Sequence, residues 1–306
     1  MNKLPKEIYN QIKDYVIFKP KNKQELQEAV DFYCENKELG IEKYGIMNNW
    51  DTSNITDMSY LFAHSTTRVF NEPINYWDTS NVKDMSFMFR GALFFNQPLN
   101  DWDTSNVTDM GYMFCHASVF NLPLNNWDTS NVTDMSYMFH HARSFNQPLN
   151  NWDTSNVTNM TMMFHHASFF NQPLNNWDTS NVTDMACMFE WAEKFNGKIG
   201  GWNTKKVKRM RDMFNFARSF NQPLYNWDTS EVHIMQGMFN NASSFNQPLN
   251  HFNVKNVNKF YAMFNMAQKF NQSLNEWEMS NDAITTCMLR DAKSFEIEKN
   301  AKWYHE

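Results

Sequence analysis

Tryptophan recurs along most of this chain at a nearly constant interval, and this regularity limits the possible folds more than any other feature. The series consists of Trp50, Trp77, Trp102, Trp127, Trp152, Trp177, Trp202, Trp227 and Trp277, and Phe252 fills the one gap. The step is 25 residues from Trp77 onward and 27 residues at the start. A repeat of this length predicts a solenoid, because a single unit can bury its large side chains only against its neighbours.

The order of apolar residues within one unit predicts its local structure. In the unit around Trp152 the apolar positions are Phe145, Leu149, Trp152, Val157, Met160, Met163, Phe164 and Ala167. From Val157 to Ala167 they are spaced by three and four, which predicts a short helix or 3₁₀ segment. Leu149–Trp152 lacks this spacing, so we expect a short strand there. The sequence therefore predicts an α/β repeat solenoid of about ten coils, with in-register strands forming one parallel sheet.

An aspartate follows the tryptophan in most units, and stacking the units places these carboxylates in one column. The column contains Asp51, Asp78, Asp103, Asp128, Asp153, Asp178 and Asp228. Like charges about 5 Å apart in water repel by about 1 kcal/mol or less. The sequence D-T-S-N favours Asx turns, in which each carboxylate accepts local backbone N–H groups. The alternative, a ladder of calcium ions, would be expected to have a glycine-rich nonapeptide repeat, which this chain lacks.

The ends of the chain depart from the repeat and predict three regions. We expect an N-terminal helical cap at residues 1–45, the solenoid at residues 46–295, and a C-terminal tail at residues 296–306. The cap contains two segments with helical spacing, Pro5–Val16 and Lys23–Cys34, separated by the sequence FKPKNK, which we interpret as a linker. Such helices would cover the apolar end of the first coil.

The repeat resembles a known family. The segments WDTSNVTDMSYMF and FNQPLNNW are similar to the 25-residue repeat of BspA-type leucine-rich-repeat proteins, which occur in bacterial and mycoplasma surface proteins, giant DNA viruses and protists. The lead-in LQEAVDFYCENKELGIEKYGIMNNWDTSN also resembles the segment that precedes these repeats in viral and protist members. The resemblance implies a right-handed leucine-rich-repeat-like stack with a binding or adhesive role, and it implies no catalytic residues.

A second resemblance concerns the N-terminus. The sequence LPKEIYNQI is similar to the opening of an F-box. That resemblance implies a ubiquitin-ligase adaptor, with a host ligase component bound through residues 1–45 and a substrate held by the repeats. Coverage of an exposed coil end is the simpler interpretation of the same segment.

Composition bounds the remaining possibilities. The chain has 27 basic and 33 acidic residues, a balance that argues against a general nucleic-acid binder. No apolar run predicts a signal peptide or a membrane span, and the four cysteines have no disulfide or CxxC spacing. We therefore expect a protein inside a cell, in the host cytoplasm or the virion if it is viral. We also expect no cofactor and no membrane partner.

No catalytic motif is recognisable among the repeats, so we expect a non-enzymatic scaffold that binds another protein. The outward asparagines beside each tryptophan, Asn126, Asn151 and Asn176, are candidate contact residues. Their repetition suits avidity or lateral packing. A surface or adhesive structural role is the alternative.

Histidines and a cysteine align when the units are stacked. One position carries Cys115, His140 and His165, followed by Glu190, and the next position carries His116, His141 and His166. Side chains of these types on neighbouring coils could share a zinc or copper ion. A solvated turn that acquired histidine through duplication of the repeat is the alternative interpretation.

One coil, GGWNTKKVKRMRDMF, departs from the repeat by its positive charge. Lys205, Lys206 and Arg209 could bind an acidic partner or a phosphate. Alternatively, Arg209 could pair with Asp184 and Lys206 with Glu231 on the neighbouring coils, each pair contributing about 0–1 kcal/mol. A single coil is too narrow for nucleic acid, which requires several phosphate contacts.

Overall fold

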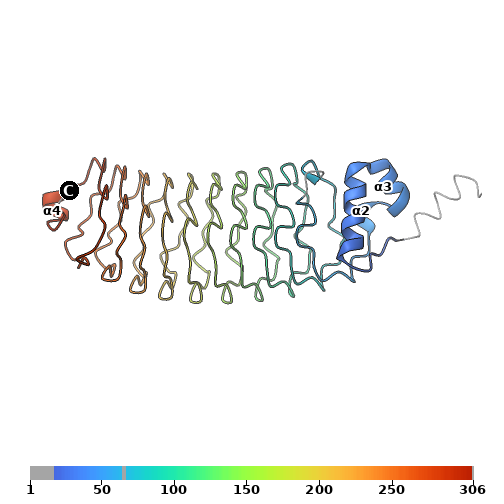
Figure 1. The fold of residues 1–306 in the computed structure, drawn as a ribbon, viewed down its shortest axis with the longest axis horizontal. Helices are drawn as coiled ribbons and strands as arrows, with labels where there is room; N and C mark the ends of the chain where they lie inside the picture. Colours follow the sequence, from blue (N-terminus) through green and yellow to red (C-terminus); the bar gives the residue numbers. More distant parts are fainter. Residues whose placement is uncertain (1–16, 64–66, 305–306) are drawn as a thin grey trace, which may run out of the picture.

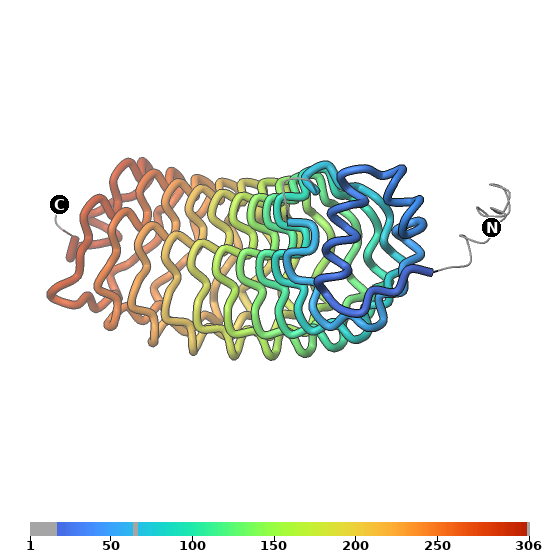
Figure 2. Tube along the Cα trace, turned by 45° about the vertical axis from the view of Figure 1, so that its right-hand side comes forward, coloured from blue at the N-terminus to red at the C-terminus, as the bar shows by residue number. Residues whose placement is uncertain are grey.

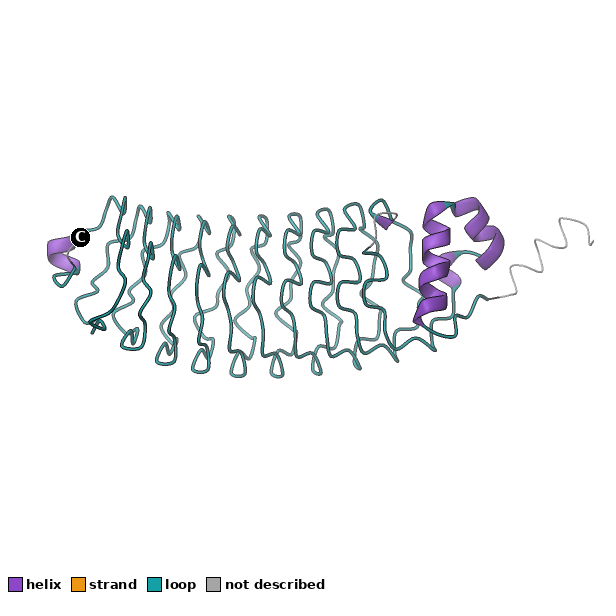
Figure 3. Ribbon diagram, in the orientation of Figure 1, coloured by secondary structure: helices purple, strands orange, loops and turns teal. Residues whose placement is uncertain are grey.

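The computed structural model describes residues 17–63 and 67–304, which form one elongated stack of coils with helices at its two ends (Figure 1). The helical elements are α2 (Lys23–Glu35), α3 (Lys37–Tyr44), the 3₁₀ helix η1 (Met47–Asn49) and α4 (Ile297–Asn300). Between η1 and α4 the described chain consists of turns, loops and single bridged residues, apart from one 3₁₀ residue, Thr67 (Figure 3).

Neighbouring coils are joined at one repeat position by isolated parallel bridges. The first bridge joins Asp57 to Asp84, and the last joins Lys259 to Ile284. Apart from the first, each bridge connects residues 25 apart, so the coils stack in register, as Figure 2 shows along the Cα trace. The solenoid predicted from the repeat is confirmed.

The predicted strand and helix within each coil are wrong. In the coil of Trp152 the bridge falls at Asn159, inside the expected helical segment, and Leu149–Trp152 contains a turn. No strand longer than a single bridged residue occurs in residues 17–63 and 67–304, and apart from the 3₁₀ residue Thr67 the helices there lie at the ends.

Backbone geometry explains the error. Met162 and His166 have φ values of 54° and 57°, a conformation that ends an α-helix. The N–H groups of Met162 and His166 donate to the next coil, at Ala186 and Glu190, over 2.9 and 2.8 Å. Intervening residues close four-residue β-turns, as when Ala167 donates to Phe164 O. Tandem turns therefore produce the spacing of three and four that predicted a helix.

The apolar repeat positions form one continuous core. Each apolar residue expected to be buried around Trp152 has a relative exposure of 2 % or less. Equivalent rings lie nearly parallel from coil to coil: Phe139 and Phe164 have centroids 5.6 Å apart at 8°, and Trp127 and Trp152 have centroids 6.2 Å apart at 3°. This aromatic stacking runs the length of the solenoid, so each coil is stabilised mainly by its two neighbours.

The tryptophan column also carries hydrogen bonds. Nε1 of Trp152 donates to the carbonyl oxygen of Leu124 in the preceding coil over 3.0 Å, and Nε1 of Trp177 donates in the same way to Leu149 over 2.9 Å. These bonds satisfy the indole N–H groups within the core.

Polar repeat residues bind one coil to the next. Thr154 is buried, and its Oγ1 donates to the backbone carbonyl of Asp178 over 2.9 Å. Nδ2 of Asn156 donates to Ser130 O over 2.7 Å, and equivalent bonds recur in neighbouring coils. The abundant asparagine and threonine therefore have a structural role.

The aspartates that follow the tryptophans form Asx turns, as expected. Oδ1 of Asp103 accepts the backbone N–H of Ser105 over 3.0 Å and its hydroxyl over 2.6 Å. The hydroxyl bond and the backbone bond lower the pKa of Asp103, so its charge is compatible with the column.

Helices α2 and α3 close the N-terminal end of the core. Asn22 caps α2, accepting a hydrogen bond from the N–H of Glu25, in agreement with the helix expected there. Rings of Phe18, Tyr33 and Tyr44 surround Trp50 at centroid distances of 5.0, 5.8 and 6.0 Å. The sequence FKPKNK is therefore more than a linker, since its phenylalanine belongs to this cap.

Lysines of the cap pair with acidic residues of the first coils. The pairs are Lys19–Asp51, Lys23–Asp57 and Lys37–Glu72, each with a nitrogen–oxygen distance of 2.8 Å. These contacts link the helical cap to the first coils of the solenoid.

The C-terminal tail packs as the start of a further coil. Trp303 stacks on Trp277 with centroids 6.5 Å apart, and its Nε1 donates to Leu274 O over 2.8 Å. Asn300 accepts the N–H of Leu274 over 2.7 Å. The tail therefore covers the last coil.

Candidate functional site

The predicted histidine column forms a cluster that spans three coils. Nδ1 of His140 lies 3.1 Å from Nδ1 of His165, so one ring nitrogen donates and the other accepts. Nε2 of His165 lies 3.5 Å from a carboxylate oxygen of Glu190. Nδ2 of Asn215 donates to the other carboxylate oxygen of Glu190 over 2.8 Å.

The second histidine position forms a stack of parallel rings. His116 and His141 have centroids 4.5 Å apart, and His141 and His166 have centroids 4.3 Å apart. The stack continues to Trp191 and Phe216, at 5.2 and 3.8 Å. Every member has a positive φ and donates its N–H to the next coil, so the turn geometry places these side chains in one row.

Burial and repulsion from neighbouring imidazoles favour the neutral forms of His140, His141 and His166. Burial, followed by the charge of His165, lowers the pKa of His140 to about 3. The pKa of His141 and that of His166 are each lowered to about 4, again chiefly by burial. Neutral imidazole is the form that binds metal ions.

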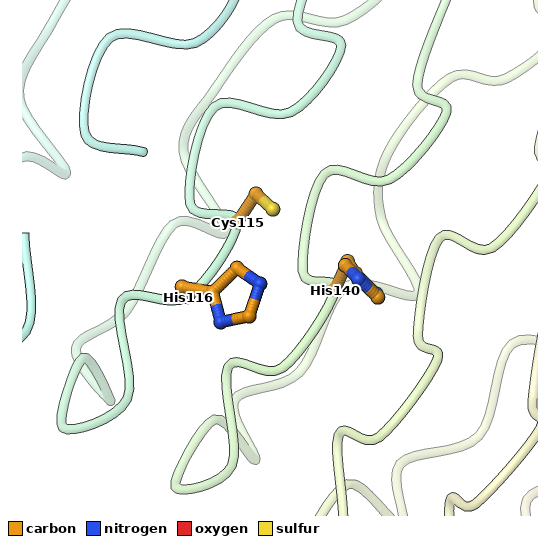
Figure 4. A group of neighbouring side chains, drawn as sticks. All are labelled: Cys115, His116 and His140. Atoms are coloured by element: carbon orange, nitrogen blue, oxygen red, sulfur yellow. The ribbon is translucent and has the colours of Figure 1, made fainter. Parts of the chain in front are cut away.

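A cysteine lies at the N-terminal edge of the cluster. Figure 4 shows Cys115 and His116 on one coil and His140 on the next. The ligand atoms of these three residues lie within 4.8 Å of one another, as do those of His140, His141 and His165. Burial raises the pKa of the Cys115 thiol to about 11, although the Arg90 guanidinium opposes this shift.

The basic coil forms one of the two ion pairs predicted with its neighbours. Nε of Arg209 lies 3.0 Å from the Asp184 carboxylate, which confirms that pair. Lys206 instead donates to Asn181 Oδ1 over 2.7 Å, and no ion pair joins it to Glu231 within the described residues. Lys205 is exposed.

The candidate contact asparagines Asn126, Asn151 and Asn176 are exposed. The backbone N–H groups of Asn126 and Asn176 donate to Asn100 Oδ1 and Asn150 Oδ1, so the backbone of this edge is already hydrogen bonded. Oδ1 of Asn126 and Oδ1 of Asn176 also accept hydrogen bonds from Nδ2 of the preceding asparagine, over 3.1 and 2.8 Å. The contact role of these side chains stays a prediction.

One surface feature was not predicted from the sequence. Large apolar side chains occupy one repeat position on the outside of the N-terminal half of the solenoid, with relative exposures of 71 % for Val69, 55 % for Phe94, 40 % for Val119 and 61 % for Phe169. We call these four residues the apolar column. The doublets Phe94–Phe95 and Phe169–Phe170 could have indicated this column. The second phenylalanine of each doublet is the buried repeat residue, so the first has to lie outside the core.

A pocket of about 350 Å³ lies beside the apolar column. The described residues that line it are Ala63, Arg68, Arg90, Gly91, Leu93 and His116. Arg68 and Leu93 immediately precede Val69 and Phe94 in the chain, so a recess with two guanidinium groups adjoins the column.

Two N-terminal predictions concern residues outside the described part of the chain. The F-box-like sequence LPKEIYNQI and the helix expected at Pro5–Val16 both lie within residues 1–16. Among the residues that the structure does describe, none of the helices is both long enough and apolar enough to cross a bilayer.

These features define a repeat solenoid with a helical N-terminal cap and a continuous aromatic core. Residues 31–144, 120–224 and 196–303 match the family described as Mycoplasma protein of unknown function, DUF285, in three overlapping copies. The chain therefore belongs to the DUF285 family. A comparison with curated proteins finds no match.

Proposed function

We propose that this protein is a non-enzymatic scaffold that binds another protein through the outer surface of its solenoid. The apolar column is the observation that carries this proposal. Single exposed apolar residues are normal on protein surfaces, but aligned ones mark interaction sites. Phe94 and Phe169 occupy the same repeat position two and five coils into the stack, where other coils carry Ser144 or Lys194.

Departures from the repeat are informative here because the repeated polar residues already have partners. Thr154, Asn156 and their equivalents are engaged between coils, so their recurrence reflects stability. Val69 and Phe94 contribute less to the stability of their coils than these buried and hydrogen-bonded residues, because most of their surface faces solvent.

The surroundings of the column favour one kind of partner, a protein with an apolar ridge flanked by acidic side chains. Arg68 and Arg90 line the adjoining pocket, and the carbonyl of Arg143 accepts the N–H of Phe169 over 3.3 Å. Aromatic residues and arginine are the types that contribute most to protein interfaces.

We further infer that the stack is a right-handed leucine-rich-repeat-like solenoid of the BspA type found in bacteria, giant viruses and protists, because its repeat sequences resemble that family. A binding role for such a solenoid is consistent with the proposed scaffold.

Site-specific photo-crosslinking in source cells tests the proposal. A photoreactive residue at position 94 or 169 should yield an adduct with one protein, and the same residue at exposed Tyr225 should not. The captured protein, purified separately, should bind the solenoid, and Phe94→Asp with Phe169→Asp should weaken binding at least about tenfold. Equal adducts at all three positions, or unchanged affinity in the double variant, would contradict the proposal.

A further inference from the structure

Two overlapping groups of metal-ligand side chains lie in the histidine cluster, and nothing in the scaffold requires them. One group is Cys115, His116 and His140, and the other is His140, His141 and His165. Other coils carry arginine, asparagine or glutamate at the first position, and residues such as glycine, tryptophan or phenylalanine at the second. These coils still stack in register, so the histidines are not needed for the fold.

The spacing in the second group matches a tetrahedral metal site. Zinc–nitrogen bonds of about 2.0–2.1 Å place two tetrahedral ligand nitrogens about 3.3–3.4 Å apart. Nδ1 of His140 and Nδ1 of His165 are 3.1 Å apart, so an ion between them requires only a small separation of the two rings. One ring nitrogen from each of His140, His141 and His165 lies within 4.8 Å of the other two.

The carboxylate of Glu190 lies next to the second group, beside His165. Histidine ligands usually donate their other ring N–H to a carboxylate, which orients the ring and strengthens the bond to the metal. Nε2 of His165 faces Glu190 at 3.5 Å while its Nδ1 faces His140. Nδ2 of Asn215 donates to the Glu190 carboxylate over 2.8 Å and holds it in place.

Electrostatics separate the two groups. The Arg90 guanidinium lies beside Cys115 and His116 and opposes a cation in the first group. In the second group, the Glu190 charge favours a cation at His165, although Arg143 acts against it near His141. The second group is therefore the better cation site.

We propose that Nδ1 of His140, Nδ1 of His165 and a ring nitrogen of His141 bind one Zn²⁺ ion, with water as the fourth ligand. Glu190 does not bind the ion but accepts a hydrogen bond from Nε2 of His165. The ion joins two neighbouring coils, because His140 and His141 lie on one coil and His165 on the next. Binding to the folded state alone stabilises the stack.

Calorimetric titration of zinc into chelator-treated protein without a histidine tag tests the site. We expect about one equivalent to bind and the melting temperature to rise with zinc concentration. His165→Asn should abolish binding, while Cys115→Ser and the exposed His233→Asn should retain it. Glu190→Gln should weaken binding about 10- to 100-fold.

Cobalt substitution gives an independent measurement on the unmodified chain. Tetrahedral Co²⁺ should produce visible absorption without the near-ultraviolet band of a thiolate ligand. Binding of less than about a tenth of an equivalent of zinc would overturn the proposal. Loss of binding in Cys115→Ser, or a thiolate band with cobalt, would also overturn it and assign the ion to the first group.

Discussion

Nε2 of His251 donates to the carbonyl oxygen of Leu224 over 3.0 Å, the bond that a tryptophan indole makes in neighbouring coils. Phe252 occupies the tryptophan position of this coil and has no N–H to donate. The preceding histidine therefore supplies the hydrogen bond that the substitution removed. This compensation indicates that the bond, as well as the buried ring, is needed in each coil.

Removal of this imidazole should destabilise the solenoid. His251→Ala removes one of the two hydrogen bonds that Leu224 O accepts, the other coming from the backbone N–H of Trp227. The loss should cost about 1 kcal/mol in the free energy of unfolding, measured with urea. In a Phe252→Trp background the same substitution should cost little, since an indole can take over the bond. An equal loss in both backgrounds would show that His251 acts in another way.

The first tryptophan should be the most tolerant of replacement. Trp50 Nε1 is buried and has no hydrogen-bond partner among the described residues, because no coil precedes it. Trp152→Phe removes a bond to Leu124 as well as ring volume, whereas Trp50→Phe removes ring volume and an unsatisfied N–H. We expect Trp152→Phe to be more destabilising by about 1 kcal/mol in chemical denaturation. The reverse order would contradict this account of the column.

The threonine column gives a more conservative test. Thr154→Val removes the hydrogen bond to Asp178 O but keeps the shape of the side chain, so the stability should fall by about 1 kcal/mol. Val254 is buried at the equivalent position of a later coil, which shows that valine fits. Thr154→Ser retains the hydroxyl and serves as the control; a loss as large as that of Thr154→Val would indicate that the methyl group matters more than the bond.

Asp212 should make the stability depend on pH. Burial, followed by the charge of Glu190, raises its pKa from 3.8 to about 6. Because the folded state holds this proton more tightly than the unfolded chain, the stabilisation is full below pH 3.8 and is lost as the pH rises through about 6.

Asp212→Asn should therefore stabilise the protein at pH 7.5 by about 1–3 kcal/mol more than at pH 4. The gain is measured as the change in unfolding free energy with a chelator present. Asparagine tolerates a positive φ well, and this alone could stabilise the variant at any pH. Asp291→Asn is the control for that effect, because Asp291 also has a positive φ, 56°, but its side chain is exposed. A gain that is independent of pH would contradict the assigned pKa.

The repeat allowed the solenoid, its register and its core to be predicted, because each buried position recurs and has to meet its own equivalent. Local conformation could not be predicted, since the positive φ values of Met162 and His166 depend on hydrogen bonds to the next coil. The histidine cluster followed from aligned positions alone. The apolar column did not, because Phe94 resembles the buried Phe95 until the structure separates the two.

The central claim is that repeated residues hold the coils together while departures from the repeat bind a partner. The measurement that tests it most directly is the affinity of the crosslinked partner for two variants of the solenoid. One carries Phe94→Asp and Phe169→Asp, and the other replaces Asn126, Asn151 and Asn176 with alanine. The account predicts loss of binding, by at least about tenfold, in the first variant and near-native affinity in the second. Retention by the first and loss by the second would contradict it and assign the contact to the asparagine edge.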